Sequence, residues 1–143
     1  MREPYTVPGA ADVLWDAISR WIADEESSVE YAEQVDDRIA VRMRQEAREA
    51  STVWWSPGQR SLTAELFVIP EPQANQESVY RLALDRNRST FRVHYALARD
   101  GGIVLRSRLS NEDVSFALLD LVLGELYDQV ELSFMPMVRM AFA

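Results

Sequence analysis

The 143-residue chain contains no cysteine and no lysine, and its one histidine is His94. Without cysteine there can be no disulfide, no thiolate nucleophile and no sulfur-ligated metal centre. Without lysine there is no Schiff-base chemistry and no P-loop. With one histidine there is no histidine pair for a metal. His94 lies in the middle of a predicted strand, where we expect an exposed residue without a catalytic role.

Glycine is also scarce, and long apolar runs are missing. None of the five glycines forms a GxGxxG or P-loop pattern, so no nucleotide cofactor is indicated. No run approaches the roughly 18 apolar residues of a membrane span. The start of the sequence, MREPYTVPGA, lacks the apolar core of a secretory signal. These absences predict a cytoplasmic protein without a membrane segment.

Acidic residues outnumber basic ones, which gives a net charge of −8. Such a surface repels phosphate backbones and anionic lipids, so we expect neither nucleic acid nor membrane as a partner. The acids stand in adjacent runs, such as Asp36-Asp37, and not at the alternate positions of a calcium loop. We therefore predict no metal, no cofactor and no enzymatic activity. A small-molecule or hydrolytic site built from scattered acids remains the alternative, because distant carboxylates can meet in space.

The composition, 48% hydrophobic and 27% charged, is that of a globular protein, and no linker divides the chain. We predict one domain over residues 1–143. Apolar residues spaced at 3.6 predict a helix that follows residues 1–8 and fades at Asp24, and a second helix over residues 75–86. Alternating residues between and after them predict three hairpins.

The first hairpin has two possible registers. A two-residue turn at Asp36-Asp37 would mix the two faces of the strands. A three-residue loop, Asp36-Asp37-Arg38, would pair Tyr31 with Met43 and set Glu30 against Arg44. We favour the three-residue loop.

The second hairpin turns at Ser56-Pro57-Gly58-Gln59, a strong turn signal. A fold about Pro57-Gly58 would place Val53 opposite Leu62. It would also point the alternating apolar residues from Leu62 to Val68 inward.

The third hairpin, around Gly101, would set Arg92 opposite Arg108 and His94 opposite Arg106. Like charges that face each other are destabilising. On an acidic protein, this arginine cluster suggests a partner that carries carboxylates. The alternative is that Glu65 or a helix acid of the same chain neutralises the cluster.

A last helix is predicted from a capping box at Ser110 and Asp113 to about Tyr127, and it can continue or restart near Pro136. It carries two apolar stripes. One can cover the sheet, and the second predicts a homodimer interface; the second stripe consists of Leu119, Leu123, Leu126 and Val130. The alternative is that residues 131–143 fold back over it. The methionine-rich tail is either adaptable binding surface or core.

The order of the elements is helix, four strands, helix, two strands, helix. This order predicts an α+β fold in which an antiparallel sheet of five to six strands has its helices packed on one face.

From about Thr52 to Phe142 the chain resembles the YbjN-like family. The resemblance rests on the segments TVWW, ELFVIPEP and VYRLALDRNRSTFRVHYALARDGGIVLRSRLS, and on the leucine-rich helix that follows. It implies a fold similar to that of type III secretion chaperones, in the order α-β-α-β-α. It also implies a bacterial protein, often dimeric, that binds peptides or acts as a regulator of sensory transduction, without enzymatic activity.

These lines lead to one hypothesis, a homodimeric chaperone- or regulator-type module that binds a peptide or protein client. The client would lie along the exposed sheet face or in a groove between helix and sheet. Aromatic and arginine side chains are frequent interface anchors. The residues we expect to contact the client are Trp54, Phe67, Arg92, Arg106 and Arg108.

Overall fold

The computed structural model describes residues 9–143. Three helices, six strands and one short 3-10 turn follow one another in the predicted order. They are α1 (Ala10–Ala23), β1 (Val29–Val35), β2 (Arg38–Arg44), β3 (Ala50–Pro57), β4 (Ser61–Ile69), α2 (Gln76–Asn87), β5 (His94–Leu97), β6 (Ile103–Ser110), the 3-10 turn η1 (Asn111–Asp113) and α3 (Phe116–Ala141).

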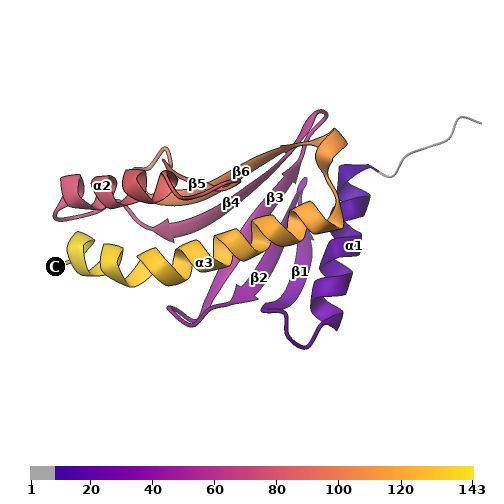
Figure 1. Ribbon diagram of the computed structural model, residues 1–143, viewed down its shortest axis with the longest axis horizontal. Coiled ribbons are helices and arrows are strands. Elements are labelled where there is room, and N and C mark those ends of the chain that lie inside the picture. Colours follow the sequence, from indigo (N-terminus) through magenta and orange to yellow (C-terminus); the bar gives the residue numbers. More distant parts are fainter. Residues whose placement is uncertain (1–8) are drawn as a thin grey trace, which may run out of the picture.

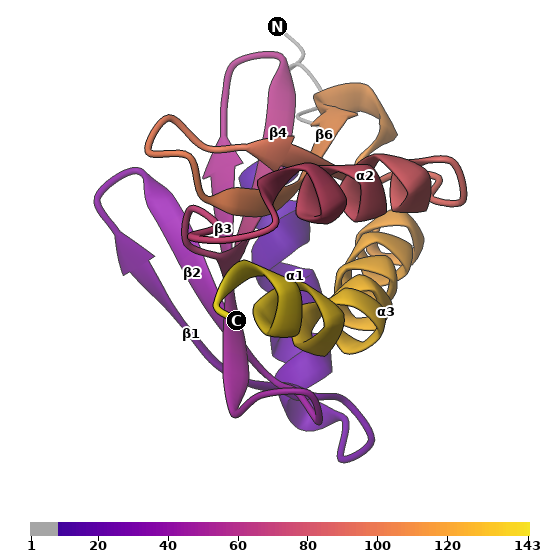
Figure 2. The ribbon, with the colours of Figure 1, turned by 90° about the vertical axis from the view of Figure 1, so that its left-hand side faces the viewer.

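The six strands form one antiparallel sheet in the order β1-β2-β3-β4-β6-β5. The three helices pack against one face of this twisted sheet, and α3 runs along almost its whole length (Figures 1 and 2). Residues alternate between the two faces, so the inward side chains of β3 and β4 are buried and their neighbours are more exposed. The predicted fold class is confirmed.

The first hairpin differs from the predicted register. Its turn is the two-residue Asp36-Asp37, and Tyr31 pairs with Arg42. A β-bulge between Val29 and Tyr31 then shifts the register, so that Val29 pairs with Met43 and both are buried. We favoured the longer loop because a two-residue turn would have placed apolar and charged residues on the same face. The bulge avoids this, because its one extra residue turns Val29 to the buried face of the sheet.

The second hairpin also differs from its predicted register, by four residues. Val53 pairs with Leu66, and Pro57 pairs with Leu62. The strand continues through Pro57 because the chain reverses one step later, where Gly58 N–H donates to the carbonyl of Ser61 at 2.9 Å. The inward face from Leu62 to Val68 is buried as predicted.

In the third hairpin His94 pairs with Arg106, which confirms the predicted pairing. Arg92 does not face Arg108 in the ladder, because β5 begins only at His94. Gly101 adopts a φ of 87°, and a Cβ there would come within 2.8 Å of the Glu71 side chain, so this turn requires glycine.

The final helix begins later than the capping-box prediction. Ser110 makes no side-chain cap, whereas Ser115 accepts the N–H of Leu118 and opens α3. The helix then runs unbroken through Pro136 to Ala141, so the tail continues the helix and does not fold back.

The predicted dimer stripe lies inside the domain. Its four side chains are buried in the core, because this is the face of α3 that packs on the sheet. They are consequently not available to a second subunit. The stripe consists of Leu119, Leu123, Leu126 and Val130. The other predicted stripe is mixed, since Val122 is buried whereas Leu121 is 56% exposed.

Two glutamate side chains of α3 accept hydrogen bonds from the backbone N–H groups of neighbouring loops. Glu125 Oε1 accepts the N–H groups of residues 91, 92 and 93 at 3.1, 2.9 and 2.7 Å. Glu131 Oε2 accepts the N–H groups of residues 46 and 47, both at 3.0 Å, and the side-chain amide of Gln45 at 2.8 Å. Hydrogen bonds to a charged acceptor are stronger than those between neutral groups. α3 thus fixes the loop before β3 and the loop before β5.

Further contacts tie α3 to the rest of the domain. Trp21 of α1 donates to Asp120 Oδ1 at 2.9 Å. The guanidinium of Arg48 lies 4.9 Å from the ring centroid of Phe134 and donates to the carbonyls of residues 67 and 68. Burial lowers the pKa of Arg48. At the end of the helix, the carbonyl of Ala141 accepts the N–H groups of residues 73 and 74.

A buried polar cluster joins α3 to β5. The hydroxyl of Tyr95 lies 2.7 Å from Ser133 Oγ, 3.1 Å from Gln129 Oε1 and 3.2 Å from the Gln129 carbonyl. All three residues are buried. Because a buried polar group without a partner is costly, this cluster fixes how β5 sits on α3.

We expect Glu131→Ala to lower the free energy of unfolding by about 1–3 kcal/mol, because three donors lose one charged acceptor. Urea unfolding followed by circular dichroism measures the change. Asp128→Ala, which removes an exposed carboxylate one turn earlier on α3, is the matched control and should change stability little. Equal losses in the two variants would contradict the anchoring role of Glu131.

Burial raises the pKa of Tyr95 above its usual value. As the pH rises, the unfolded chain therefore loses the phenolic proton of Tyr95 at a lower pH than the folded chain does. The stabilising contribution of the neutral phenol is complete below a pH of about 10 and is lost as the pH rises through the folded pKa. We expect Tyr95→Phe to reduce the loss of stability above that pH, and also to cost about 1–2 kcal/mol at neutral pH because its partners stay buried.

Urea unfolding at several pH values between neutral and alkaline measures both effects. The control is Tyr31→Phe, since Tyr31 lies on the surface of the sheet and is half exposed. An unchanged alkaline loss of stability in Tyr95→Phe would contradict this assignment.

Candidate functional site

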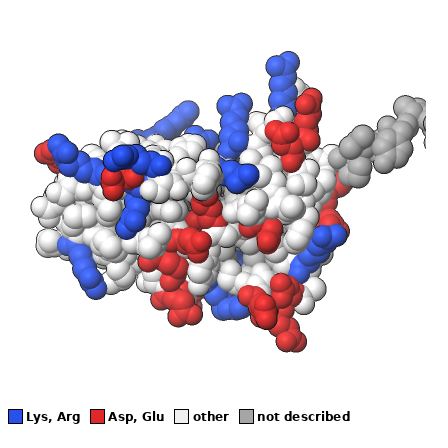
Figure 3. Space-filling view, in the orientation of Figure 1, with Lys and Arg blue, Asp and Glu red and all other residues white. Residues whose placement is uncertain are grey.

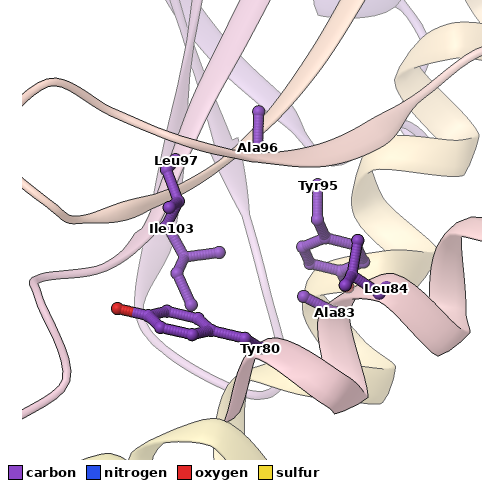
Figure 4. Close-up of a pocket in the computed structure, with 7 residues that line it drawn as sticks. All are labelled: Tyr80, Ala83, Leu84, Tyr95, Ala96, Leu97 and Ile103. Atoms are coloured by element: carbon purple, nitrogen blue, oxygen red, sulfur yellow. The ribbon is translucent and has the colours of Figure 1, made fainter. Parts of the chain in front are cut away.

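An apolar groove of about 310 Å³ lies between α2 and the β5–β6 hairpin. The α2 side chains and the strand side chains face each other across it, whereas Ala96 points away (Figure 4). The groove is positioned by the contact of α2 with β5 and by the hold of α3 on both. Its lining consists of Tyr80, Ala83, Leu84, Tyr95, Ala96, Leu97 and Ile103.

The groove runs beside the open edge of the sheet, because within residues 9–143 β5 pairs only with β6. The backbone N–H of Tyr95 donates to Asn87 Oδ1 at 2.7 Å, and Asn87 Nδ2 donates back to the carbonyl of Tyr95 at 3.2 Å. An asparagine side chain therefore occupies the place of a neighbouring strand at this residue. Backbone groups alternate in direction along an antiparallel strand. The N–H and C=O of Leu97, two residues on, are consequently directed to the open edge.

Exposed apolar side chains line the groove and stand in the loop that leads to β5. Leu84 on α2 is 67% exposed, Leu97 on β5 is 60% exposed, and Phe91 in the connecting loop is 87% exposed. These are the largest exposed fractions among the exposed large apolar residues of the described chain. An accumulation of apolar side chains at a groove is typical of an interaction site.

The opposite face of the sheet carries a smaller, polar hollow of about 250 Å³. Arg106 pairs with Glu65 at 3.2 Å, and the guanidinium of Arg38 lies 4.4 Å from the Trp54 ring centroid. Glu65 thus partly neutralises the arginine cluster, as in the alternative interpretation of the sequence. The hollow is lined by Arg38, Trp54, Ser56, Thr63, Glu65 and Arg106.

The predicted client-binding residues divide between two places. Trp54 and Arg106 come together in the hollow. Arg108, which donates to Ser61 Oγ at 3.2 Å, and the half-exposed Phe67 share the same outer face. Arg92 does not join them. It lies in the loop before β5, where its N–H is held by Glu125.

A third hollow, of about 510 Å³, is acidic and lies between α1, the following loop and α3. Acidic side chains gather over this part of the molecule, in the lower middle and lower right of the view (Figure 3). The acids that line the hollow are Asp24, Glu26, Asp120 and Asp128. Burial and the charges of Glu131, Glu46 and Asp128 raise the pKa of the neighbouring Tyr127.

Within residues 9–143, no three histidine or acidic residues come close enough together to hold a metal ion. None of the three described helices is long and apolar enough to cross a membrane.

A groove between helix and sheet is one of the two client sites that the sequence predicts, but the sequence does not assign its lining. The helical spacing over residues 75–86 predicts Val79, Leu82 and Ala83 as the inward face and gives Leu84 no role. The alternation of Phe91, Val93, Tyr95 and Leu97 predicts Leu97 as inward, whereas it is 60% exposed. The sequence does contain one signal for this site. Leu84 stands on a helix face that is otherwise charged, and the strand that follows this helix is short.

A family model described as "Putative bacterial sensory transduction regulator" matches residues 15–134. An uncharacterised protein of Mycobacterium leprae is 36% identical over 105 residues, which are 73% of this chain and 57% of that protein. Uncharacterised proteins of Mycobacterium bovis and Mycobacterium tuberculosis are each 34% identical over 87 residues, 61% of this chain and 48% of those proteins. The chain spans about half the length of the curated relatives it matches. The chain belongs to the YbjN family.

Proposed function

We propose that this YbjN-family protein is a non-enzymatic, regulator-type module that binds a peptide segment of another protein in the groove between α2 and β5. One observation carries the proposal. Leu84 and Leu97, two of the three most exposed large apolar side chains of residues 9–143, line a groove that runs beside an unpaired strand edge. An edge strand next to an apolar groove is suited to an extended peptide, which pairs with the backbone and places alternate side chains in the groove.

The lining of the groove favours a peptide over a small molecule. Small-molecule sites usually enclose their ligand and direct several polar groups at it. Here the lining is almost entirely apolar, and its rim residues Leu84 and Leu97 are mostly exposed, which describes an open channel. Apart from the phenols of Tyr80 and Tyr95, the side chains of this lining are hydrocarbon, in line with a role in binding.

The outer sheet face is a second contact surface in this proposal. Trp54 and Arg106 line its hollow, while Phe67 and Arg108 lie on the same face. Exposed ion pairs such as Arg106–Glu65 contribute little to stability. Their charged groups are therefore free to exchange partners when a client binds.

The homodimer and the cytoplasmic location remain predictions. Since the proposed leucine stripe is part of the core, a dimer has to use another surface, and the exposed Leu121 and Leu132 of α3 are available. Light scattering on the purified chain measures the mass in solution, and cell fractionation measures the location.

We expect Leu97→Asp to abolish recovery of a protein partner, because a charge at the groove rim opposes burial against an apolar segment. The measurement is affinity purification of the tagged protein from its source bacterium, followed by mass spectrometry. Ile22→Asp is the matched control, since Ile22 on α1 is also an exposed apolar side chain and lies outside the groove lining.

A partner that is recovered equally with the wild type and with Leu97→Asp would contradict the groove as the binding site. Loss of the partner in both aspartate variants would do so as well, because the effect would not be specific to the groove.

We expect the double change Arg106→Glu and Arg108→Glu to weaken recovery of the same partner severalfold, because it reverses the charge of the outer face. The control is Arg20→Glu with Arg60→Glu, an equal change of charge on α1 and on the β3–β4 loop. Unchanged recovery with the Arg106 and Arg108 variant would remove the outer face from the contact.

A further inference from the structure

Charge is unevenly distributed around the groove. Residues 80–99, from the first groove residue on α2 into the turn that follows β5, hold five arginines and one acid, Asp85. The stretch thus carries a net charge of +4 with His94 neutral, in a chain whose total is −8. Glu77 and Asp100 stand outside its two ends. The arginines are Arg81, Arg86, Arg88, Arg92 and Arg99.

From this distribution we propose, resting on the proposed function, that the segment bound in the groove is acidic. It is an extended peptide whose apolar side chains enter the groove and whose flanking aspartates or glutamates meet the arginines of α2 and of the loops next to β5. Charge complementarity of this kind determines which partners bind and how fast they associate.

Two of the arginines stand next to the apolar rim. Arg81 and Arg88 line a shallow hollow together with Leu84, which also lines the groove. Their side chains are 79% and 83% exposed, and their partners, Glu77 and Asp85, lie on the same helix and are nearly as exposed. Such pairs are weak, so an acidic ligand can replace them at little cost.

The free edge of β5 determines the direction in which a bound peptide lies and the residue at which its backbone pairing starts. Asn87 already bonds the backbone of Tyr95, so the free backbone groups begin at Leu97. A peptide that pairs there lies along the mouth of the groove, and its side chains on the helix side reach Leu84 and Tyr80. Acids beyond its apolar residues then face Arg88, past Leu84, at one end, and Arg81, next to Tyr80, together with Arg99 at the other.

The experiment uses the full chain and two fluorescent peptides. Each has the same central run of alternating leucine and threonine, flanked by two aspartates at each end in one peptide and by two arginines in the other. Fluorescence anisotropy at low salt measures binding. We expect the acidic peptide to bind at least tenfold more tightly, and its affinity to fall as salt is added, because salt screens exposed charges.

Variants that remove arginine charge show which arginines cause the preference for the acidic peptide. Arg81→Gln with Arg88→Gln should weaken the acidic peptide roughly three- to tenfold at low salt. Arg20→Gln with Arg60→Gln, the same loss of charge on other elements, should leave its affinity unchanged. Equal weakening by both pairs would overturn the local charge argument, because only the total charge would matter.

The outcomes separate the two proposals. If both peptides bind equally and both are lost in Leu97→Asp, the groove binds peptides but the acidic preference is wrong. Tighter binding of the arginine peptide also overturns the preference. If neither peptide binds, both proposals fail. If light scattering shows that the chain associates with itself and that Leu97→Asp prevents this, the occupant is a second copy and the acidic peptide is wrong.

Discussion

The structure depends on the polar side chains by which α3 holds the rest of the domain. Apolar packing alone would let a long helix slide over a sheet, because hydrophobic contact has no direction. Hydrogen bonds from loop N–H groups to Glu125 and Glu131, and from Trp21 to Asp120, fix its position at three places along its length. The buried bond between Tyr95 and Ser133 fixes β5 on the same helix.

This anchoring explains why an unpaired edge can persist. β5 has only four residues and one neighbouring strand, which by itself is a weak attachment. Because Glu125 holds the loop before β5 and Asn87 bonds Tyr95, the strand keeps its shape without a second neighbour. The groove beside it is therefore formed before any partner arrives, and a preformed site binds at a lower entropic cost.

The fold was predictable from the sequence because its signals are local. The alternation of apolar residues gave the strands, and the 3.6-residue spacing gave the helices. The hairpin registers at Asp36 and Pro57 were wrong, since a bulge and a late chain reversal depend on how neighbouring strands pair. The leucine stripe was assigned to a dimer because a sequence does not tell which of two apolar helix faces meets the sheet. The residues that line the groove were missed for a similar reason: Leu84 and Leu97 belong to different elements and become neighbours only when α2 packs on β5.

Hydrogen exchange at the Leu97 amide tests the central claim most directly. This N–H is directed to the open edge, so it should exchange rapidly in the free protein. Once the partner recovered from cells is bound, the account predicts strong protection of this amide, while the amides of β1, at the far edge of the sheet, remain unchanged. Unaltered exchange at Leu97 in a saturated complex, with protection elsewhere, would contradict binding at the β5 edge.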